Sequence, residues 1–369
     1  MRLSLQGINH NLRKIFGHLD GILLALVVAI LIISAAVVFS ASGQSTARLT
    51  GHLMNMALAL TVMVVIANIP PHLLARVGPL LYVLGVALLI GVALFGEVRN
   101  GARRWINLGF AFQPSELLKL ALPLMLAWYF QRNEAILGWK HHAIGGVLLM
   151  LPFLLILRQP DLGTAMLIGA SGFYLLFFAG LSWKIIIGGA TIVLASLPLG
   201  WNMMHGYQQQ RVMTLLDPSS DPLGAGYHII QSSIAIGSGG LLGDGWMRGT
   251  QNQLNFIPER TTDFIFAVFG EEFGYLGALV LMLLYVGIVA RGLVIAARAS
   301  SLFGRLMAGT ISLNFFTYVF VNMGMVSGVL PVVGVPLPLM SYGGTAMITL
   351  LLGLGMVMSV ATHRQLNKS

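Results

Sequence analysis

The sequence predicts an all-α protein that crosses a membrane about ten times, and three observations lead to this fold class. Of the 369 residues, 57% are hydrophobic and 9% are charged, whereas a soluble domain has roughly 25% charged residues. The hydrophobic residues gather into about ten runs, each near the roughly 20 residues that a helix needs to cross a bilayer. The 21 Lys and Arg residues are scattered over the short segments between these runs. We therefore expect one integral membrane domain over residues 1–369.

The composition also excludes several classes of function. The net charge of +9 is spread over many connecting segments and forms no single basic stripe, so we expect no nucleic-acid partner. The chain has no cysteine, which excludes disulfides, thiolate nucleophiles and cysteine-ligated metal centres. The Gly-rich run over 237–245 fits neither a Walker A loop nor a dinucleotide fingerprint. Without a nucleotide motif, any chemistry must use an activated substrate or a gradient.

The hydrophobic runs and the breakers between them place the membrane helices along the chain. The approximate spans are 20–40, 53–69, 80–96, 115–130, 143–157, 163–180, 184–201, 264–290, 306–327 and 343–361. The first run is longer than the apolar core of a secretory signal, so we interpret it as an uncleaved anchor helix. With the N-terminus in the cytoplasm, the inner side carries twelve Lys and Arg residues and the outer side eight, and Lys119 stays inside a span. This balance favours a cytoplasmic location of both termini.

The connection over 202–263 is far longer than the others and is expected on the outer side. Loops of about 60 residues in compact domains are usually functional. Its apolar run Tyr227–Ile236 is too short to cross a bilayer, so we expect an interfacial or re-entrant helix there. The glycines that follow, over 237–245, predict a flexible loop.

Four outer segments place polar groups where helices that run inward begin. They are Gln113–Glu116, Gln159–Thr164, Pro258–Asp263 and Pro336–Gly344. Proline followed by Ser, Asp or Thr is typical of a helix N-terminus, and the positive ends of four helices would suit a phosphate group. The alternative is that these residues cap the helices and serve folding alone.

Ionisable side chains inside the predicted spans are further candidates for a functional site. Glu116 and Lys119 lie three residues apart in the fourth span, and Glu271 and Glu272 lie in the eighth. A charge at the centre of a span is unfavourable by roughly 2.5–3.5 kcal/mol, so such groups usually face the bundle interior and mark a pathway or a site. They equally fit a neutralising pair that locks helices together.

Asp263 is the candidate general base. It follows Glu259 by four residues, so both carboxylates share one face if the helix starts at Pro258. Apolar neighbours at the membrane boundary raise the pKa of a carboxyl, and Arg260 opposes that shift. The alternative role is a helix cap, and the spacing does not choose between the two.

Arg99, Arg103 and Arg104, with Trp105, form a basic and aromatic cluster in the loop before Gln113. Because arginine binds phosphate through a planar fork and tryptophan prefers the membrane interface, the cluster suits the head group of a lipid diphosphate. Binding to ordinary anionic membrane lipid is the alternative.

Six segments together resemble a known family. They are Gly101–Ile106, Gln113–Glu116 with Lys119, Gln159–Thr164, Asp221–Tyr227, Pro258–Phe264 and Ser341–Gly344. In content and in order along nearly the whole chain, they resemble the SEDS proteins of shape, elongation, division and sporulation. Arg260 and the long stretch from Asp217 to Ser232 resemble the elongation branch of that family.

The resemblance implies a peptidoglycan glycosyltransferase that polymerises lipid II during cell elongation and rod-shape maintenance. Its expected place is the outer (periplasmic) face of the bacterial cytoplasmic (inner) membrane, beside a class B penicillin-binding protein and other elongation-complex proteins. Undecaprenyl diphosphate would be the leaving group and Asp263 the catalytic residue. The residues expected to bind substrate are Arg103, Arg104, Trp105, Gln113, Ser115, Glu116, Lys119, Gln159, Asp161, Thr164, Glu259, Arg260, Ser341 and Tyr342.

Several points differ from the family or stay open. Thr261 stands where many relatives have histidine, so this position supplies no imidazole base and the demand on Asp263 grows. The basic residue expected at the outer start of the second span is Arg48 or His52. A diphosphate leaving group is compatible with help from a divalent cation such as Mg²⁺, so that question stays open. No other cofactor is expected. The alternative function is a lipid II flippase, which buried charges would also suit; the unusual polar residues concentrate on one face, which favours the enzyme.

Overall fold

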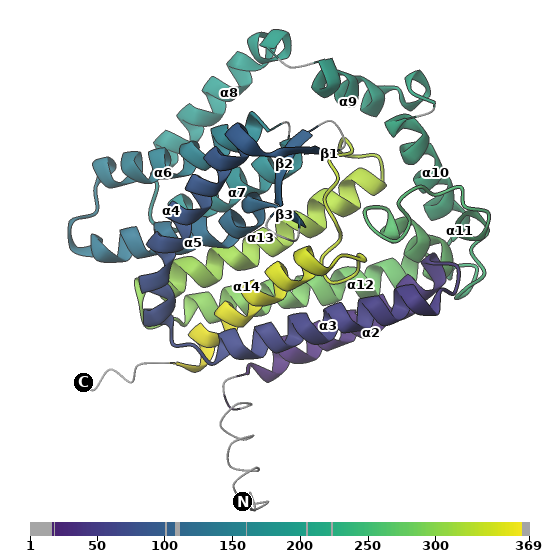
Figure 1. Ribbon diagram of the computed structural model, residues 1–369, viewed down its shortest axis with the longest axis horizontal. Coiled ribbons are helices and arrows are strands. Elements are labelled where there is room, and N and C mark those ends of the chain that lie inside the picture. The colour runs from purple at the N-terminus through teal and green to yellow at the C-terminus, as the bar shows by residue number, and fades with distance from the viewer. Residues whose placement is uncertain are drawn as a thin grey trace, which may run out of the picture.

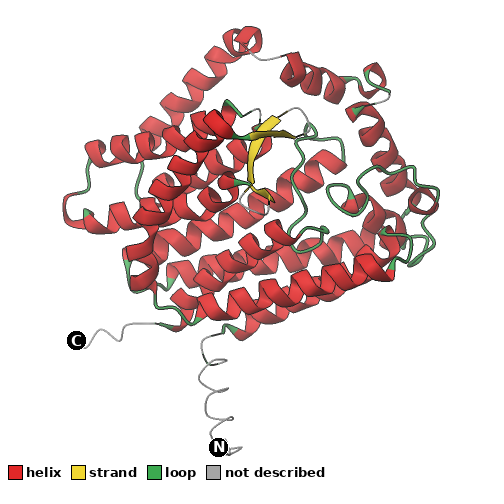
Figure 2. Cartoon of the chain, in the orientation of Figure 1, coloured by secondary structure: helices red, strands yellow, loops and turns green. Residues whose placement is uncertain are grey.

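The computed structural model describes residues 17, 19–99, 102–107, 111–159, 161–203, 206–222 and 224–363. Within these ranges the protein is a bundle of long helices (Figures 1 and 2). Each predicted hydrophobic run overlaps one helix. These helices are α2 (Gly21–Ala41), α3 (Thr46–Ala67), α4 (Pro71–Phe95), α5 (Pro114–Arg132), α6 (Trp139–Leu157), α7 (Leu162–Phe178), α8 (Trp183–Met203), α12 (Ile265–Ala297), α13 (Leu302–Val326) and α14 (Gly344–Thr362).

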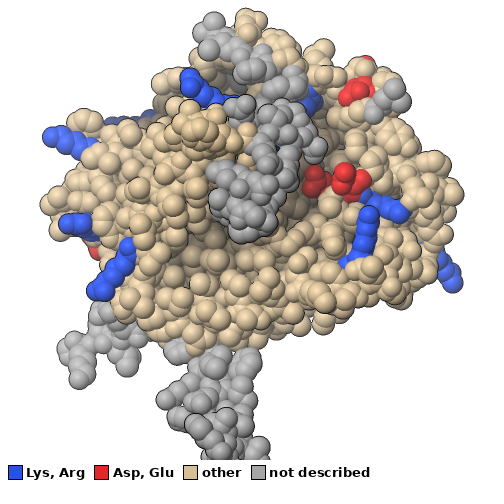
Figure 3. Space-filling model, in the orientation of Figure 1, with Lys and Arg blue, Asp and Glu red and all other residues tan. Residues whose placement is uncertain are grey.

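The bundle has the lengths and surfaces of a membrane protein. Among the described helices, seven are long and apolar enough to cross a membrane, and Leu162–Phe178 and Trp183–Ser196 are shorter apolar helices. On the face drawn in Figure 3, a broad area of the described surface carries no charged side chain. An all-α polytopic membrane protein is therefore confirmed, whereas the count of ten spans and the cytoplasmic termini stay predictions.

Several helices begin at residue types that favour a helix N-terminus. Asp20 accepts a hydrogen bond from the Leu23 amide at 3.0 Å, and Ser301 accepts one from the Gly304 amide at 3.1 Å. Such side chains satisfy amides that have no partner inside the helix. Helices α4 and α5 begin instead at Pro71 and Pro114, where a missing N–H does no harm.

Small residues let neighbouring helices approach closely in the core. A Cβ atom at Gly355 of α14 would lie 2.6 Å from the carbonyl oxygen of Met63 in α3, and these two helices run side by side in Figure 1. A Cβ atom at Gly85 of α4 would lie 2.8 Å from the Leu118 side chain of α5. Close contact through glycine is typical of membrane helices, because lipid tails are as apolar as the packed side chains and association depends on packing.

The long connection contains further helices. They are α9 (Gly206–Leu216), the short η2 (Pro218–Ser220), α10 (Ala225–Ser238) and α11 (Thr250–Gln253). Helix α10 covers the predicted run Tyr227–Ile236 and packs against α12 and α13. Its buried Ser232 hydroxyl donates to the carbonyl oxygen of Val326 at 2.8 Å. The predicted short helix is present, and it is fixed to the bundle.

The glycine-rich run is not the flexible loop that the sequence predicts. Helix α12 is interrupted at Gly274, whose φ is 64°, and the run bonds to the backbone around this break. The Asp244 amide donates to the carbonyl oxygen of Glu271, and the Tyr275 amide donates to that of Gly240, at 3.0 and 2.9 Å. A Cβ atom at Gly243 would lie 2.2 Å from the carbonyl oxygen of Glu272. The glycines permit close backbone contact, and the prediction of flexibility is wrong for this reason.

Three short strands, which the sequence analysis does not predict, lie between α4 and α5. They are β1 (Glu97–Arg99), β2 (Ala102–Asn107) and β3 (Ala111–Phe112). They pair antiparallel in the order β1-β2-β3. This small sheet lies above α13 and α14 in the view of Figure 2 and places Arg104 and Trp105 at the end of the bundle where α5 begins.

The two adjacent carboxylates of α12 hold the long connection in place. Buried Glu271 accepts hydrogen bonds from the backbone amides of Gln251 and Asn252 at 2.7 and 3.2 Å. Glu272, also buried, accepts one from the hydroxyl of Ser40 in α2. The sequence leaves open whether these carboxylates mark a functional site or hold helices together. The structure supports the second alternative for Glu271 and Glu272, although their partners are backbone amides and a hydroxyl.

Replacing Glu271 with alanine should destabilise the fold. The change leaves the Gln251 and Asn252 amides without their acceptor, and an unsatisfied buried group costs about 1–3 kcal/mol. We expect a clearly lower thermal midpoint in detergent micelles. Glu134→Ala, which removes an exposed carboxylate, is the matched control. Equal midpoints for the two variants would show that the Glu271 bonds contribute nothing to stability.

Candidate active site

Asp263 lies in a tight turn before α12. The amides of Thr262 and Phe264 both donate to the carbonyl oxygen of Glu259, at 3.0 and 3.3 Å, and Glu259 has a φ of 47°. The helix begins only at Ile265. The prediction that Glu259 and Asp263 share a helix face from Pro258 is therefore wrong, because the turn closes on itself before the helix starts.

Side chains from two other segments hold this turn. The buried amide nitrogen of Asn322, in α13, donates to the carbonyl oxygens of Asp263 and Val335 at 2.8 and 2.7 Å. The Ser341 hydroxyl donates to the carbonyl oxygen of Thr262 at 2.6 Å and accepts from the amide of Leu337 at 2.8 Å. We call these contacts of Asn322 and Ser341 the clamp. It fixes the backbone that carries Asp263.

The Asp263 side chain occupies a half-buried position beside the loop that follows α13. A Cβ atom at Gly334 would lie 3.5 Å from its Oδ2 atom. Burial, and then the nearby negative charge of Glu259, raise the pKa of the Asp263 carboxyl to about 6. The N-cap residue of α12 is Phe264, and no side chain caps the helix, so the structure does not support the alternative that Asp263 is a cap.

A second set of predicted residues meets around Asp161. We call Asp161, Thr164, Gln113 and Arg104 the Asp161 group. Its Oδ1 atom accepts from the Thr164 amide at 3.1 Å and thereby caps α7. Its Oδ2 atom accepts from the side-chain amide of Gln113 at 3.0 Å and lies 3.6 Å from an Arg104 nitrogen. Buried Gln159 donates to the carbonyl oxygen of Leu89 at 3.3 Å. Asp161 thus joins the start of α7, the start of α5 and strand β2.

The loop after α13 lies between the Asp161 group and the turn that carries Asp263. A Cβ atom at Gly163, near the start of α7, would lie 2.8 Å from the carbonyl oxygen of Val333 and 3.2 Å from the Val335 side chain. Between these two valines lies Gly334, which faces the Asp263 carboxylate. The Asp161 group and Asp263 therefore lie on either side of one short loop segment.

Lys119 points into the bundle from α5. Its Nζ atom lies 2.6 Å from the Glu116 carboxylate and 5.3 Å from the centre of the Tyr318 ring. Ser115, one turn earlier, is 2% exposed. The structure therefore confirms the neutralising pair of Glu116 and Lys119, which lies on the same helix as Gln113.

The remaining predicted residues are spread around these groups. Arg260 donates to the carbonyl oxygen of Asn252, so it holds α11 to the turn. The Glu259 carboxylate accepts from the Thr262 hydroxyl at 2.8 Å. The Tyr342 ring stacks on the buried His52 ring at 5.8 Å. Trp105 pairs with Glu97 in the small sheet; for Arg103, whose backbone pairs with Val98, the side chain lies outside what the structure describes.

Comparison with known proteins follows the same motifs. The model of the cell cycle protein family of FtsW, RodA and SpoVE matches residues 19–366. The chain belongs to this family. It is the SEDS family that the motifs resemble, and the resemblance is thereby confirmed.

Relatives match almost the full chain. The peptidoglycan glycosyltransferase MrdB of Escherichia coli strain K12 is 53% identical over 351 residues, which are 95% of this chain and 95% of that one. A chain of a peptidoglycan synthase complex, described as structurally coordinating polymerization and crosslinking, superposes with a TM-score of 0.80 at 34% identity, covering 95% of this chain and 99% of its own. The crystal structure of Thermus thermophilus RodA gives 0.70 at 30% identity, covering 94% and 97%.

Two residues that contact the turn of Asp263 and Phe264 are not marked by the sequence motifs. Asn322 is an uncharged residue inside an apolar run, so no charge marks it in the sequence. His228 of α10 stacks on Phe264 at 5.2 Å, although 36 positions separate them. An amide inside a span is a signal that could have been used for Asn322, because such groups need a buried partner. Among the described residues, no three His, Cys, Asp or Glu side chains gather as a metal site would require.

Replacing Asn322 with leucine should loosen the clamp. The change removes both donors to the carbonyl oxygens of Asp263 and Val335, so we expect faster hydrogen exchange in the 261–264 turn and the 333–341 loop. Asn314→Leu is the matched control, since Asn314 lies on the same helix and bonds to Ser171 instead. Unchanged exchange in both segments of the Asn322 variant would contradict the clamp.

Proposed function

We propose that this protein is a peptidoglycan glycosyltransferase that polymerises lipid II at the outer face of the bacterial cytoplasmic membrane. The names of its relatives support this class of activity. The observation that carries the mechanism is Asp263, a half-buried carboxylate with a raised pKa that is fixed by the clamp. A general base is most effective when its pKa lies near the working pH, and a pKa of about 6 suits that task.

Asp263 is the proton acceptor in the proposed reaction. It takes the proton from the 4-hydroxyl of the acceptor N-acetylglucosamine as that oxygen attacks the anomeric carbon of the donor N-acetylmuramic acid. The bond from the anomeric carbon to the diphosphate breaks as the new glycosidic bond forms. The configuration inverts, so an α-linked donor gives a β-linked glycan, and undecaprenyl diphosphate leaves.

The Asp161 group and Lys119 are the proposed site for the departing diphosphate. Fixed cations stabilise the charge that develops on a leaving group. Arg104 has 31% of its side chain exposed and Lys119 has 10%, so Arg104 is the more accessible of the two. Asp161 and Glu116 hold these cations in place before substrate arrives.

The other predicted substrate residues divide by what they bond to. Ser341, Gln159 and Arg260 bond to backbone carbonyl oxygens, which makes them positioning residues. Glu259, near Asp263, acts through charge. Direct contact with sugar or peptide stays a proposal for the rest of the predicted set, which is Arg103, Trp105, Gln113, Ser115, Thr164 and Tyr342.

The proposed partner is a class B penicillin-binding protein that cross-links the glycan during cell elongation, together with other elongation-complex proteins. The similarity to a chain from a complex that coordinates polymerization and crosslinking supports such a partner. The proposed orientation puts the Asp263 end of the bundle in the periplasm, because the glycan is built there. The flippase alternative predicts transport of lipid II without polymer, so polymer formation and transport, measured in one sample, separate the two.

Asp263→Asn should abolish polymer formation from purified lipid II. The amide keeps the shape of the side chain but accepts no proton, and loss of a general base lowers the rate by about 10² to 10⁴. Asp244→Asn, which neutralises an exposed carboxylate of the long connection, should keep the wild-type rate. Polymer formation by the Asp263 variant at the wild-type rate would show that Asp263 is not the general base. A parallel reaction with a chelator and restored Mg²⁺ tests whether a divalent cation assists.

The rate should depend on pH through Asp263. The ionised carboxylate is the active form, so kcat/KM should fall as the pH drops through about 6 and level off above it. Glu259→Gln removes the negative charge that helps to raise the pKa of Asp263 and should move this midpoint to lower pH. The matched control is Glu134→Gln, an exposed carboxylate outside the site. A midpoint that stays in place in the Glu259 variant contradicts the assigned cause.

A further inference from the structure

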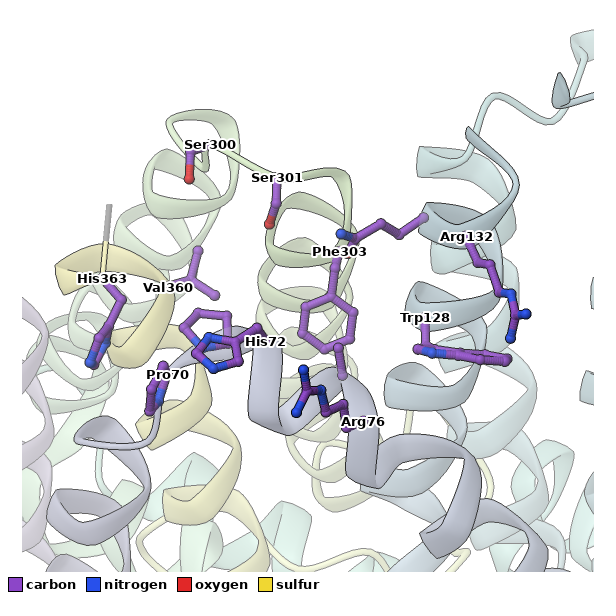
Figure 4. Close-up of a pocket in the computed structure, with 13 residues that line it drawn as sticks. Pro70, His72, Arg76, Trp128, Arg132, Ser300, Ser301, Phe303, Val360 and His363 are labelled. Carbon is purple, nitrogen blue, oxygen red and sulfur yellow. The ribbon is translucent and has the colours of Figure 1, made fainter. Parts of the chain in front are cut away.

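A cavity of about 650 Å³ opens at the end of the bundle opposite Asp263 (Figure 4). Four helix ends surround it: the starts of α4 and α13 and the ends of α5 and α14. Helix α5 runs from the Asp161 group to this cavity, and its 19 residues correspond to about 28 Å. The cavity is therefore about one bilayer core away from the candidate active site, and no step of the proposed reaction uses it.

The ionisable side chains that line the cavity are all basic. Arg76 and His72 come from α4, Arg132 from α5 and His363 from the end of α14, and the lining contains no Asp or Glu. In the described part of the chain, neither arginine forms an ion pair, and Arg132 lies over the Trp128 ring at 5.4 Å. Helix α4 begins here without a side-chain cap, but the negative ends of α5 and α14 offset its positive end, so the attraction for an anion comes from the two arginines. The site suits an anion.

The cavity is not purely polar. Trp128, Phe303 and Val360 form its inner wall, and Figure 4 shows Phe303 above Arg76 with Trp128 to its side. An apolar strip continues from Arg76 along α4: Leu80 and Val83 follow it by four and seven residues and are 70% and 63% exposed. Residues at this spacing lie on one face of a helix. An anionic group beside Arg76 would therefore have a track for hydrocarbon leading towards the membrane centre.

We propose that this cavity binds the phosphate head group of an anionic phospholipid from the leaflet opposite Asp263. The two arginines hold the phosphate through their planar forks. The glycerol region lies against Trp128, at the depth where tryptophan is favoured, and one acyl chain follows Leu80 and Val83. Basic pockets between membrane helices on the cytoplasmic side are the type of site that such head groups occupy.

A free phosphate ion shares the charge of this ligand but not its shape. It would use Arg76 and Arg132 and would leave the strip of Leu80 and Val83 without a role. Dispersed attraction of lipid to the basic surface would depend on every arginine at that end of the bundle, including Arg298, which is exposed and outside the cavity lining. These alternatives make different predictions for the same measurement.

Native mass spectrometry of the full chain, released from micelles that contain equal amounts of phosphatidylglycerol and phosphatidylcholine with the same acyl chains, tests the proposal. We expect the wild type to retain phosphatidylglycerol preferentially. Arg76→Gln with Arg132→Gln should lower that preference by about fivefold for each arginine. Arg298→Gln should keep it. The lysine pair, Arg76→Lys with Arg132→Lys, keeps both charges and should fall between the wild type and the glutamine pair.

Three results would overturn the proposal. An unchanged preference in both the glutamine and the lysine pairs would show that the arginines do not hold the lipid. An equal loss in the Arg298 variant would show attraction to surface charge alone. Displacement of phosphatidylglycerol by excess inorganic phosphate, with the same dependence on Arg76 and Arg132, would identify the ligand as a free anion. Thermal midpoints equal to that of the wild type confirm that each variant is folded.

Discussion

The architecture of the candidate site depends on one buried amide. Asn322 donates two hydrogen bonds, one to the turn that carries Asp263 and one to the loop that faces its carboxylate. Inside a membrane helix no water satisfies such groups, so an amide with two well-placed acceptors strongly restricts where the acceptors lie. The turn and the loop come from segments 59 and 13 residues away. The backbone of Asp263 is therefore fixed by Asn322, and its half-buried carboxylate does not have to cap a helix to stay in place.

The two proposals assign different tasks to the two ends of the bundle. At one end, carboxylates and cations are arranged by backbone contacts, with Asp161 holding Arg104 and the Asn322 and Ser341 contacts holding the Asp263 turn. At the other end, arginines line a cavity without carboxylates. Proton transfer needs a fixed geometry and a tuned pKa, whereas lipid binding needs charge and an apolar track. The different composition of the two ends fits these proposed tasks.

The sequence predicts the helices well because each must satisfy its own backbone and present apolar side chains to lipid. It also predicts that Arg104, Gln113 and Asp161 belong to one site, through their resemblance to a family. It does not predict the turn at Glu259, because local spacing fits a helix equally well. Nor does it predict the contact of the glycines near 240 with the break at Gly274, since which backbone groups meet across the bundle depends on tertiary packing.

The most direct test of the account uses proteoliposomes that contain fluorescent lipid II in both leaflets and the protein with its cross-linking partner. Polymer length and movement of lipid II between leaflets are followed in the same sample, for the wild type and for Asp263→Asn. We expect polymer from the wild type, none from the variant, and the same transbilayer movement of lipid II in both. Movement that depends on the protein, with no polymer from the wild type, would contradict the proposed glycosyltransferase and support a transporter.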